Sequence, residues 1–163
     1  MGMQLIETIE VGSGGAASIE FTSIPQDGVD LEIRLSSRVG GTYVDENIFI
    51  TLNGNTTNDG SIILRGTGTG VGGQSLTYVA AKTSGGGTTS NTFGNASFYI
   101  SNYTSSNDKS ISIDSVLENN ASSAWQVITA GQTPVGAVTE IELYGSYDFQ
   151  QYSTASLYKI TAD

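Results

Sequence analysis

The side chains that most often carry catalysis are missing from this sequence of 163 residues, which contains no histidine and no cysteine. A Ser-His-Asp triad and a metal held by histidine or thiolate are therefore impossible. A glycosidase-like pair of carboxylates remains, and it needs two acids about 5 to 9 Å apart around one sugar bond. Glu140 and Glu142 share one face of an expected strand. Their neighbours are typical of a solvated sheet face, so we expect no enzyme.

Oxygen-rich loops are the candidates for a metal site. They are Asp45-Glu46-Asn47, Asn58-Asp59-Gly60 and Glu118-Asn119-Asn120. Calcium takes about six to eight oxygens, usually from several loops that converge. None of the three has the spaced acids of an EF-hand loop. We therefore interpret them as ordinary turns and expect no metal and no other cofactor.

The aromatic side chains suggest a contact surface instead. The sequence holds eight Tyr, five Phe and one Trp. Tyrosine and tryptophan suit interfaces and sugar platforms, because each joins a large apolar body to a polar group. For Trp125, Phe21 and Phe98 we expect core packing. Tyr147 and Tyr152 fall in an expected loop, where an interface and plain packing both stay open. Both belong to a C-terminal cluster of Tyr144, Tyr147, Phe149, Tyr152 and Tyr158.

The charge pattern bears on the class of partner. Sixteen acids and six bases give a net charge of −10, and the six cations are scattered along the chain. A protein that binds duplex nucleic acid normally presents a basic stripe, so we expect no nucleic-acid partner. No run approaches 18 apolar residues, and the first residues do not form a signal-peptide pattern. We therefore expect no contact with a membrane.

Short alternating segments, separated by Gly, Ser, Thr and Asn, predict an all-β fold. The clearest segment is 30–38, where Leu31, Ile33 and Leu35 point to one side and the polar residues between them point to the other. Similar reasoning predicts about ten strands, near 4–11, 17–23, 30–38, 47–52, 75–82, 96–101, 109–116, 124–130, 137–145 and 155–161. This pattern indicates one domain, residues 1–163, built as a two-sheet antiparallel β-sandwich.

Several local features follow from the same pattern. We expect strand 4–11 to lie at a sheet edge and to form a hairpin with 17–23 through the turn at 12–15. Asn53-Gly54 is a strong hairpin signal. The glycine-rich segments 66–73 and 84–90 are predicted to be flexible loops, and 114–120 has the pattern of one short helical turn.

Three passages together resemble a group of small bacteriophage virion proteins. They are IEFTSIP (19–25), YISNY (99–103) and SLYKI (156–160), each with its flanking residues. Proteins of this group begin with a similar I-x-F-x-S-I-P passage and end in a Ser-Leu-Tyr-Gly-Ile strand. Ser101 stands here at a usual proline position, and Lys159 stands at the usual glycine position. The resemblance implies a jelly-roll-like sandwich.

The resemblance also implies a role on the capsid surface of a virion. We expect a decoration (cement) protein that binds the outside of the head through the major capsid protein and through copies of itself, as a dimer or trimer. The alternative is a tail- or fibre-associated module that recognises a host-surface glycan. The candidate interface residues are Leu5 and Ile6 in the N-terminal strand, with Tyr147, Phe149 and Tyr152 near the C-terminus.

Overall fold

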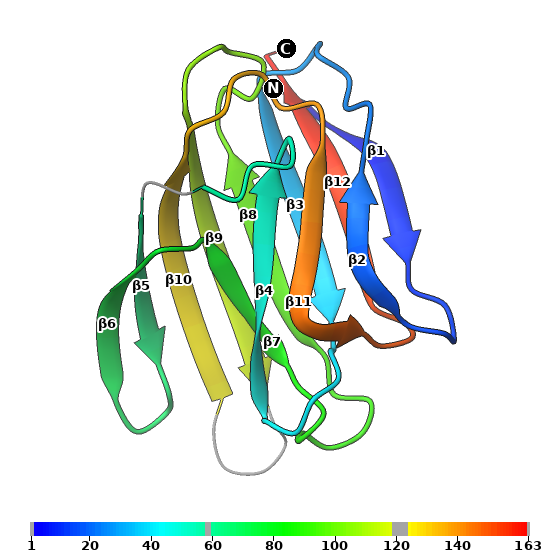
Figure 1. Ribbon diagram of the computed structural model, residues 1–163, viewed down its shortest axis with the longest axis vertical. Coiled ribbons are helices and arrows are strands. Elements are labelled where there is room, and N and C mark those ends of the chain that lie inside the picture. The colour runs from blue at the N-terminus through cyan, green and yellow to red at the C-terminus, as the bar shows by residue number, and fades with distance from the viewer. Residues whose placement is uncertain (1, 58–59, 119–123, 163) are drawn as a thin grey trace.

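Two antiparallel sheets face each other in the computed structural model (Figure 1), which confirms the predicted all-β sandwich. The structure describes residues 2–57, 60–118 and 124–162, with backbone alone for 124–126. In spatial order the large sheet contains β1 (Gly2–Glu10), β12 (Thr154–Thr161), β3 (Asp30–Ser37), β8 (Gly94–Ile100), β9 (Lys109–Glu118), β10 (Ala124–Thr133), β5 (Ser61–Gly66) and β6 (Val71–Leu76). The small sheet contains β2 (Ala16–Phe21), β11 (Ile141–Phe149), β4 (Asp45–Leu52) and β7 (Ala80–Ser84).

The strand order is that of a jelly roll with two inserted hairpins. If β5, β6, β9 and β10 are set aside, the other eight strands, renumbered along the chain, give sheets of order 1-8-3-6 and 2-7-4-5. This is the pair of interleaved sheets that defines the jelly roll. The inserted strands β9, β10, β5 and β6 continue the large sheet beyond β8. The large sheet is therefore twice as wide as the small one.

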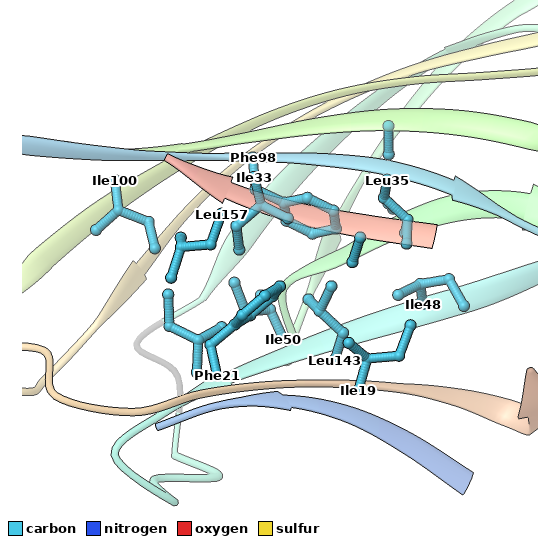
Figure 2. Close-up of a cluster of buried hydrophobic side chains, with 14 of the residues drawn as sticks. Ile19, Phe21, Ile33, Leu35, Ile48, Ile50, Phe98, Ile100, Leu143 and Leu157 are labelled. Carbon is cyan, nitrogen blue, oxygen red and sulfur yellow. The ribbon is translucent and has the colours of Figure 1, made fainter. Parts of the chain in front are cut away.

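The core lies between the facing sheets and follows from the period-2 pattern of the strands. Alternate residues of each strand point inward, and Figure 2 shows side chains from both sheets meeting in one apolar layer. Complete burial of one such side chain contributes about 1.5–3 kcal/mol. Among the buried members are Ile19, Phe21, Ile33, Leu35, Ile48, Ile50, Phe98, Ile100, Leu143 and Leu157.

Hydroxyl groups of the large sheet satisfy the backbone along β7, the last strand of the small sheet. Thr129 Oγ1 donates to Ala80 O (2.9 Å), and Lys82 N donates to Ser115 Oγ (3.1 Å). Both hydroxyl side chains are buried. A buried backbone group without a partner would cost about 1–3 kcal/mol, so these side chains stabilise the edge of the small sheet against β9 and β10.

Tyr103 connects three loops at one end of the sandwich. Its hydroxyl donates to Pro25 O and accepts from Gly28 N (3.1 Å), both in the loop between β2 and β3. Its backbone O accepts from Val138 N (2.8 Å), in the loop before β11. The side chain is completely buried. Residues 25–28 and 138 are therefore held by one residue of the β8–β9 loop.

Two predicted hairpins are wrong, although both turns exist. β1 lies at the edge of the large sheet, as expected, but it pairs with β12, while β2 pairs with β11 in the small sheet. Asn53 and Gly54 both have positive φ (53° and 68°), as their turn requires, yet the chain then crosses to the large sheet. β1 and β2 are consecutive strands in opposite sheets, and Asn53-Gly54 leads into the hairpin inserted in the large sheet, so the topology overrides the local turn signal in both places.

Three further predictions are corrected by the strand pattern. The single strand expected at 75–82 is two strands, because β6 ends at Leu76 in one sheet and β7 begins at Ala80 in the other. The helical turn expected at 114–120 is wrong up to Glu118, where the chain is strand β9. Half of the glycine-rich segment 66–73 lies in strands, because β5 ends at Gly66 and β6 begins at Val71.

Removal of the Tyr103 hydroxyl tests its role in the fold. In Tyr103→Phe, Gly28 N and Pro25 O each lose a hydrogen-bond partner. We expect the free energy of unfolding to fall by about 1–3 kcal/mol in urea denaturation followed by circular dichroism. Tyr43→Phe, on an exposed side chain, is the control. Equal stability of the two variants would contradict the role assigned to Tyr103.

Candidate functional site

A polar concavity of about 480 Å³ lies at one end of the sandwich. It is formed by the β3–β4 loop, the β7–β8 loop and the β11–β12 loop, which follow strands far apart in the sequence. The polar and aromatic side chains that line it include Arg38, Ser90, Asn91, Gln150, Gln151 and Tyr152. The jelly roll brings these residues together, because β3, β7 and β11 all end at the same end of the sandwich (Figure 1).

Arg38 holds the β7–β8 loop against the end of β3. Its Nη1 donates to Thr88 Oγ1, Thr89 O (3.0 Å) and Thr92 O (3.2 Å). Its Nη2 donates to Thr88 O (3.2 Å) and Gly86 O (3.3 Å). The planar guanidinium matches several acceptors at fixed angles, which an ammonium group does not. Arg38 therefore fixes the shape of this wall of the concavity, and burial lowers the pKa of its guanidinium from the ordinary value.

The glycines of the β7–β8 loop are required by close approach of two backbones. Gly86 N donates to Gly40 O (3.1 Å), and Gly87 N donates to Tyr43 O (2.9 Å). A Cβ atom on Gly86 would lie 2.1 Å from Gly41 O. The sequence predicted a flexible loop at 84–90. In the structure these glycines allow the loop to contact the β3–β4 loop without a steric clash.

Two non-glycine residues that line the concavity have left-handed backbones. The φ angles are 64° at Asn91 and 70° at Tyr152. This conformation is common for asparagine and unusual for a bulky residue such as tyrosine. Tyr152 N donates to Val11 O (2.9 Å), which helps to fix its backbone. The Tyr152 side chain is 60% exposed, so it forms a free aromatic surface beside the polar lining.

Glu46 lies behind the β3–β4 loop and is an unusual buried acid. A Cβ atom on Gly41 would lie 2.9 Å from its Oε1, and that oxygen has no hydrogen-bond partner among the described residues. Burial raises the pKa of the Glu46 carboxyl, Lys82 opposes the shift, and the neighbouring Asp45 adds to it. Lys82 itself pairs with Asp45 (Nζ–Oδ2 2.8 Å). The charged form of Glu46 is therefore less favourable in the folded protein than in water.

The predicted interface residues fall in two regions and in one case inside the core. Leu5 is half exposed on β1, and Ile6 is partly buried against the core at a β-bulge. Tyr147 lies in β11, not in a loop, and its ring sits over Gly41. Tyr152 lines the concavity. Phe149 is wrong as an interface residue, because its side chain is completely buried between the sheets.

A second surface was missed by the sequence analysis. Strands β10, β5 and β6 present apolar side chains on the outer face of the large sheet, away from the small sheet. Ile128 pairs with Leu64 and Leu64 pairs with Gly73, so one row crosses all three strands. No strand was predicted between residues 53 and 74, which hid the alternation of Ser61, Ile62, Ile63 and Leu64.

The acids considered for chemistry, Glu140 and Glu142, lie near the end of the loop before β11 and in β11 itself. Glu140 is exposed, and Glu142 accepts a hydrogen bond from Thr51 Oγ1 (3.2 Å). In residues 2–57, 60–118 and 124–162 no group of three or more acids could hold a metal ion. The same part of the chain contains no helix long and apolar enough to cross a membrane. Residues 58–59, 119–120 and the Trp125 side chain, all considered above, lie outside what the structure describes.

Replacement of Arg38 tests its control of the loop. Arg38→Lys keeps the charge and loses the fork of donors, so the carbonyls of residues 86–92 lose their partners. We expect faster amide hydrogen exchange in 85–92 and a loss of about 2 kcal/mol in stability, within the range for bonds to charged groups. Arg34→Lys is the matched control, because Arg34 is exposed and contacts Glu32 (2.6 Å). Unchanged exchange in Arg38→Lys would contradict the assignment.

The raised pKa of Glu46 makes a prediction about pH. The folded state binds this proton more tightly than the unfolded state, so the stability from Glu46 falls as pH rises from its ordinary pKa of 4.5 through its raised folded pKa. Glu46→Gln should therefore unfold at higher urea concentration than wild type at pH 7, with the difference disappearing below pH 4.5. Glu10→Gln, at the exposed end of β1, is the control. A less stable Glu46→Gln at pH 7 would refute this account.

Comparison with known proteins found no matching family model, no matching curated protein and no matching solved structure. The likeness to phage virion proteins rests on the three sequence passages alone, so it remains an expectation. The two surfaces described above are the remaining guide to function.

Proposed function

We propose that this protein is a non-catalytic decoration protein that binds the outside of a bacteriophage capsid. The observation that carries the proposal is the apolar outer face of β10, β5 and β6, which we call the flank patch. Its large members are Ile128 (50% exposed), Leu64 (57%), Ile62 (60%) and Val71 (94%). Contiguous exposed apolar side chains, set in an otherwise polar surface, mark sites of protein contact.

The position of the flank patch supports a role in adhesion. β6 is the last strand of the large sheet, so the backbone groups along its outer edge have no neighbouring strand in the described chain. Such an edge can accept a strand from another protein, while the adjacent apolar side chains supply contact area. β1 forms the opposite edge of the same sheet, with Met3 and Leu5 exposed. The large sheet thus has two edge strands, β1 and β6, that can contact other proteins.

The flank patch also differs from its surroundings in charge. The chain carries a net charge of −10, which opposes close approach of a second copy or of another acidic surface. The outer faces of β10, β5 and β6 carry no acidic side chain, and the nearest acid on this face, Asp114, lies at the border of the patch opposite Ile128, so contact centred on β5 and β6 reduces like-charge repulsion. Many weak contacts of this kind, repeated over a shell, hold firmly through avidity. The major capsid protein and further copies of this chain are the partners we propose.

The resemblance to virion proteins implies that these contacts are made on a capsid. A protein that stabilises a shell needs a rigid body and adhesive surfaces, and it needs no catalytic group. The wide, well-packed sandwich meets the first need, and the flank patch meets the second. The proposed location is the capsid surface.

The number of copies per particle tests this function. Quantitative mass spectrometry of purified particles should find the protein in a fixed, high ratio to the major capsid protein. Rebinding of purified protein to particles that lack it should be about tenfold weaker for Leu64→Glu, because a charge then enters an apolar contact. Ser36→Glu adds the same charge to the polar centre of the outer face as the control. Only a few copies per particle, or equal rebinding of both variants, would overturn the proposal.

A further inference from the structure

We propose that the loop concavity at the end of the sandwich is a binding site for an uncharged saccharide chain. This role is additional to shell decoration and does not depend on it. The residues assigned to the site are Tyr152 as an aromatic platform and Asn91, Gln150 and Gln151 as hydrogen-bonding groups. Their placement comes from two loops that only the folded jelly roll brings together.

The side chains of the lining have the chemistry of a sugar site. A carboxamide both donates and accepts hydrogen bonds, which is the pattern that a sugar hydroxyl offers in return. Within the described chain the side chains of Asn91, Gln150 and Gln151 make no hydrogen bond, and Gln150 and Gln151 are exposed. Their polar groups are therefore available to a ligand. The volume of about 480 Å³ falls in the range of small-molecule sites and suits a short oligosaccharide.

The backbone at Tyr152 is unusual, because a bulky residue lies there in the left-handed region. Of the five non-glycine residues with positive φ in the described chain, two are Asn91 and Tyr152. Strained backbone conformations cluster at ligand sites, where the surrounding structure holds them in place. At Tyr152 that structure is the bond from its N–H to Val11 O and a turn in which Ser153 N donates to Gln150 O (3.1 Å). The strained turn holds Tyr152 at the surface beside the free amides.

The rigidity of the wall and the charge of the chain favour an uncharged ligand. Arg38 directs its terminal N–H groups to acceptors of residues 86–92, so the wall is set before a ligand arrives and the guanidinium is not free to pair with an anion. A preformed wall lowers the ordering cost of binding. The net charge of −10 repels acidic polysaccharides. An uncharged sugar chain is therefore the ligand class that fits.

The experiment measures binding of the whole protein to two panels of oligosaccharides. One panel contains neutral chains of glucose, galactose, mannose and N-acetylhexosamines, and the other contains chains of uronic acids. We expect binding to at least one neutral chain, with shifts of the backbone amide signals of Gly86, Asn91 and Gln150 in NMR titrations. The uronic-acid chains should not bind.

Two variants then test Tyr152 and Asn91, and a third serves as the control, in calorimetric titrations with the neutral chain that binds. Tyr152→Asn removes the ring at a backbone that asparagine tolerates, and Asn91→Gly removes the amide at a backbone that glycine tolerates. We expect each to weaken binding about tenfold or more. Tyr43→Asn is the matched control, because Tyr43 is 67% exposed in the β3–β4 loop and does not line the concavity. Its affinity should equal that of wild type.

Each result of these experiments either supports or overturns the proposed site. No binding by any neutral chain, binding by the uronic-acid chains only, or amide shifts confined to other parts of the molecule would each overturn the site. Equal affinity of Tyr152→Asn and wild type would do the same. The NMR titration of wild type decides the question if either variant fails to fold. Copy number on particles is measured independently, so failure here leaves the decoration proposal to its own test.

Discussion

Apolar packing between two sheets of unequal width determines the rest of this structure. The inner rows of β2, β11, β4 and β7 pack against the large sheet, and buried hydroxyls such as Thr129 Oγ1 satisfy the backbone where the small sheet ends. Beyond β7 the large sheet continues through β5 and β6, which no other strand of the described residues faces (Figure 1). The flank patch lies on the outer face of this overhang and of the adjoining β10.

Three cationic side chains of this molecule hold loops in place through hydrogen bonds. Arg38 binds the acceptors of residues 86–92, and the buried Lys109 donates from Nζ to Ser105 O (2.8 Å) and to Asn107 O. Burial lowers the pKa of the Lys109 ammonium. Lys159 reaches Asp27 (2.7 Å), and this hydrogen bond lowers the pKa of the Asp27 carboxyl. Side chains from strand ends thus set the shape of loops that are rich in Gly, Ser, Thr and Asn.

The alternation of apolar and polar residues predicted most of the strands, but it predicted poorly how the strands connect and pair. Segment 30–38 was recognised because its period-2 pattern has one wet face, and it is β3. The pairing of β1 with β12 depends on contacts between the two ends of the sequence, which no local turn reveals. In β6 the residues Gly72 and Gly73 lack the β-branched side chains that mark a strand. The sequence pointed to only part of the concavity. Tyr152 was singled out as an aromatic residue in a loop, whereas Asn91 is brought to the same concavity by the fold alone.

The pairing of the first and last strands has a practical consequence. Gly2 lies opposite Thr161, and the two ends of the chain are neighbours in Figure 1. A few linker residues would therefore close the chain into a ring without moving either strand. New ends could then be opened at the tip of the β5–β6 turn, residues 67–70, none of which lines the concavity. Such a circular permutant would keep the jelly roll while it changes the order in which its strands are synthesised.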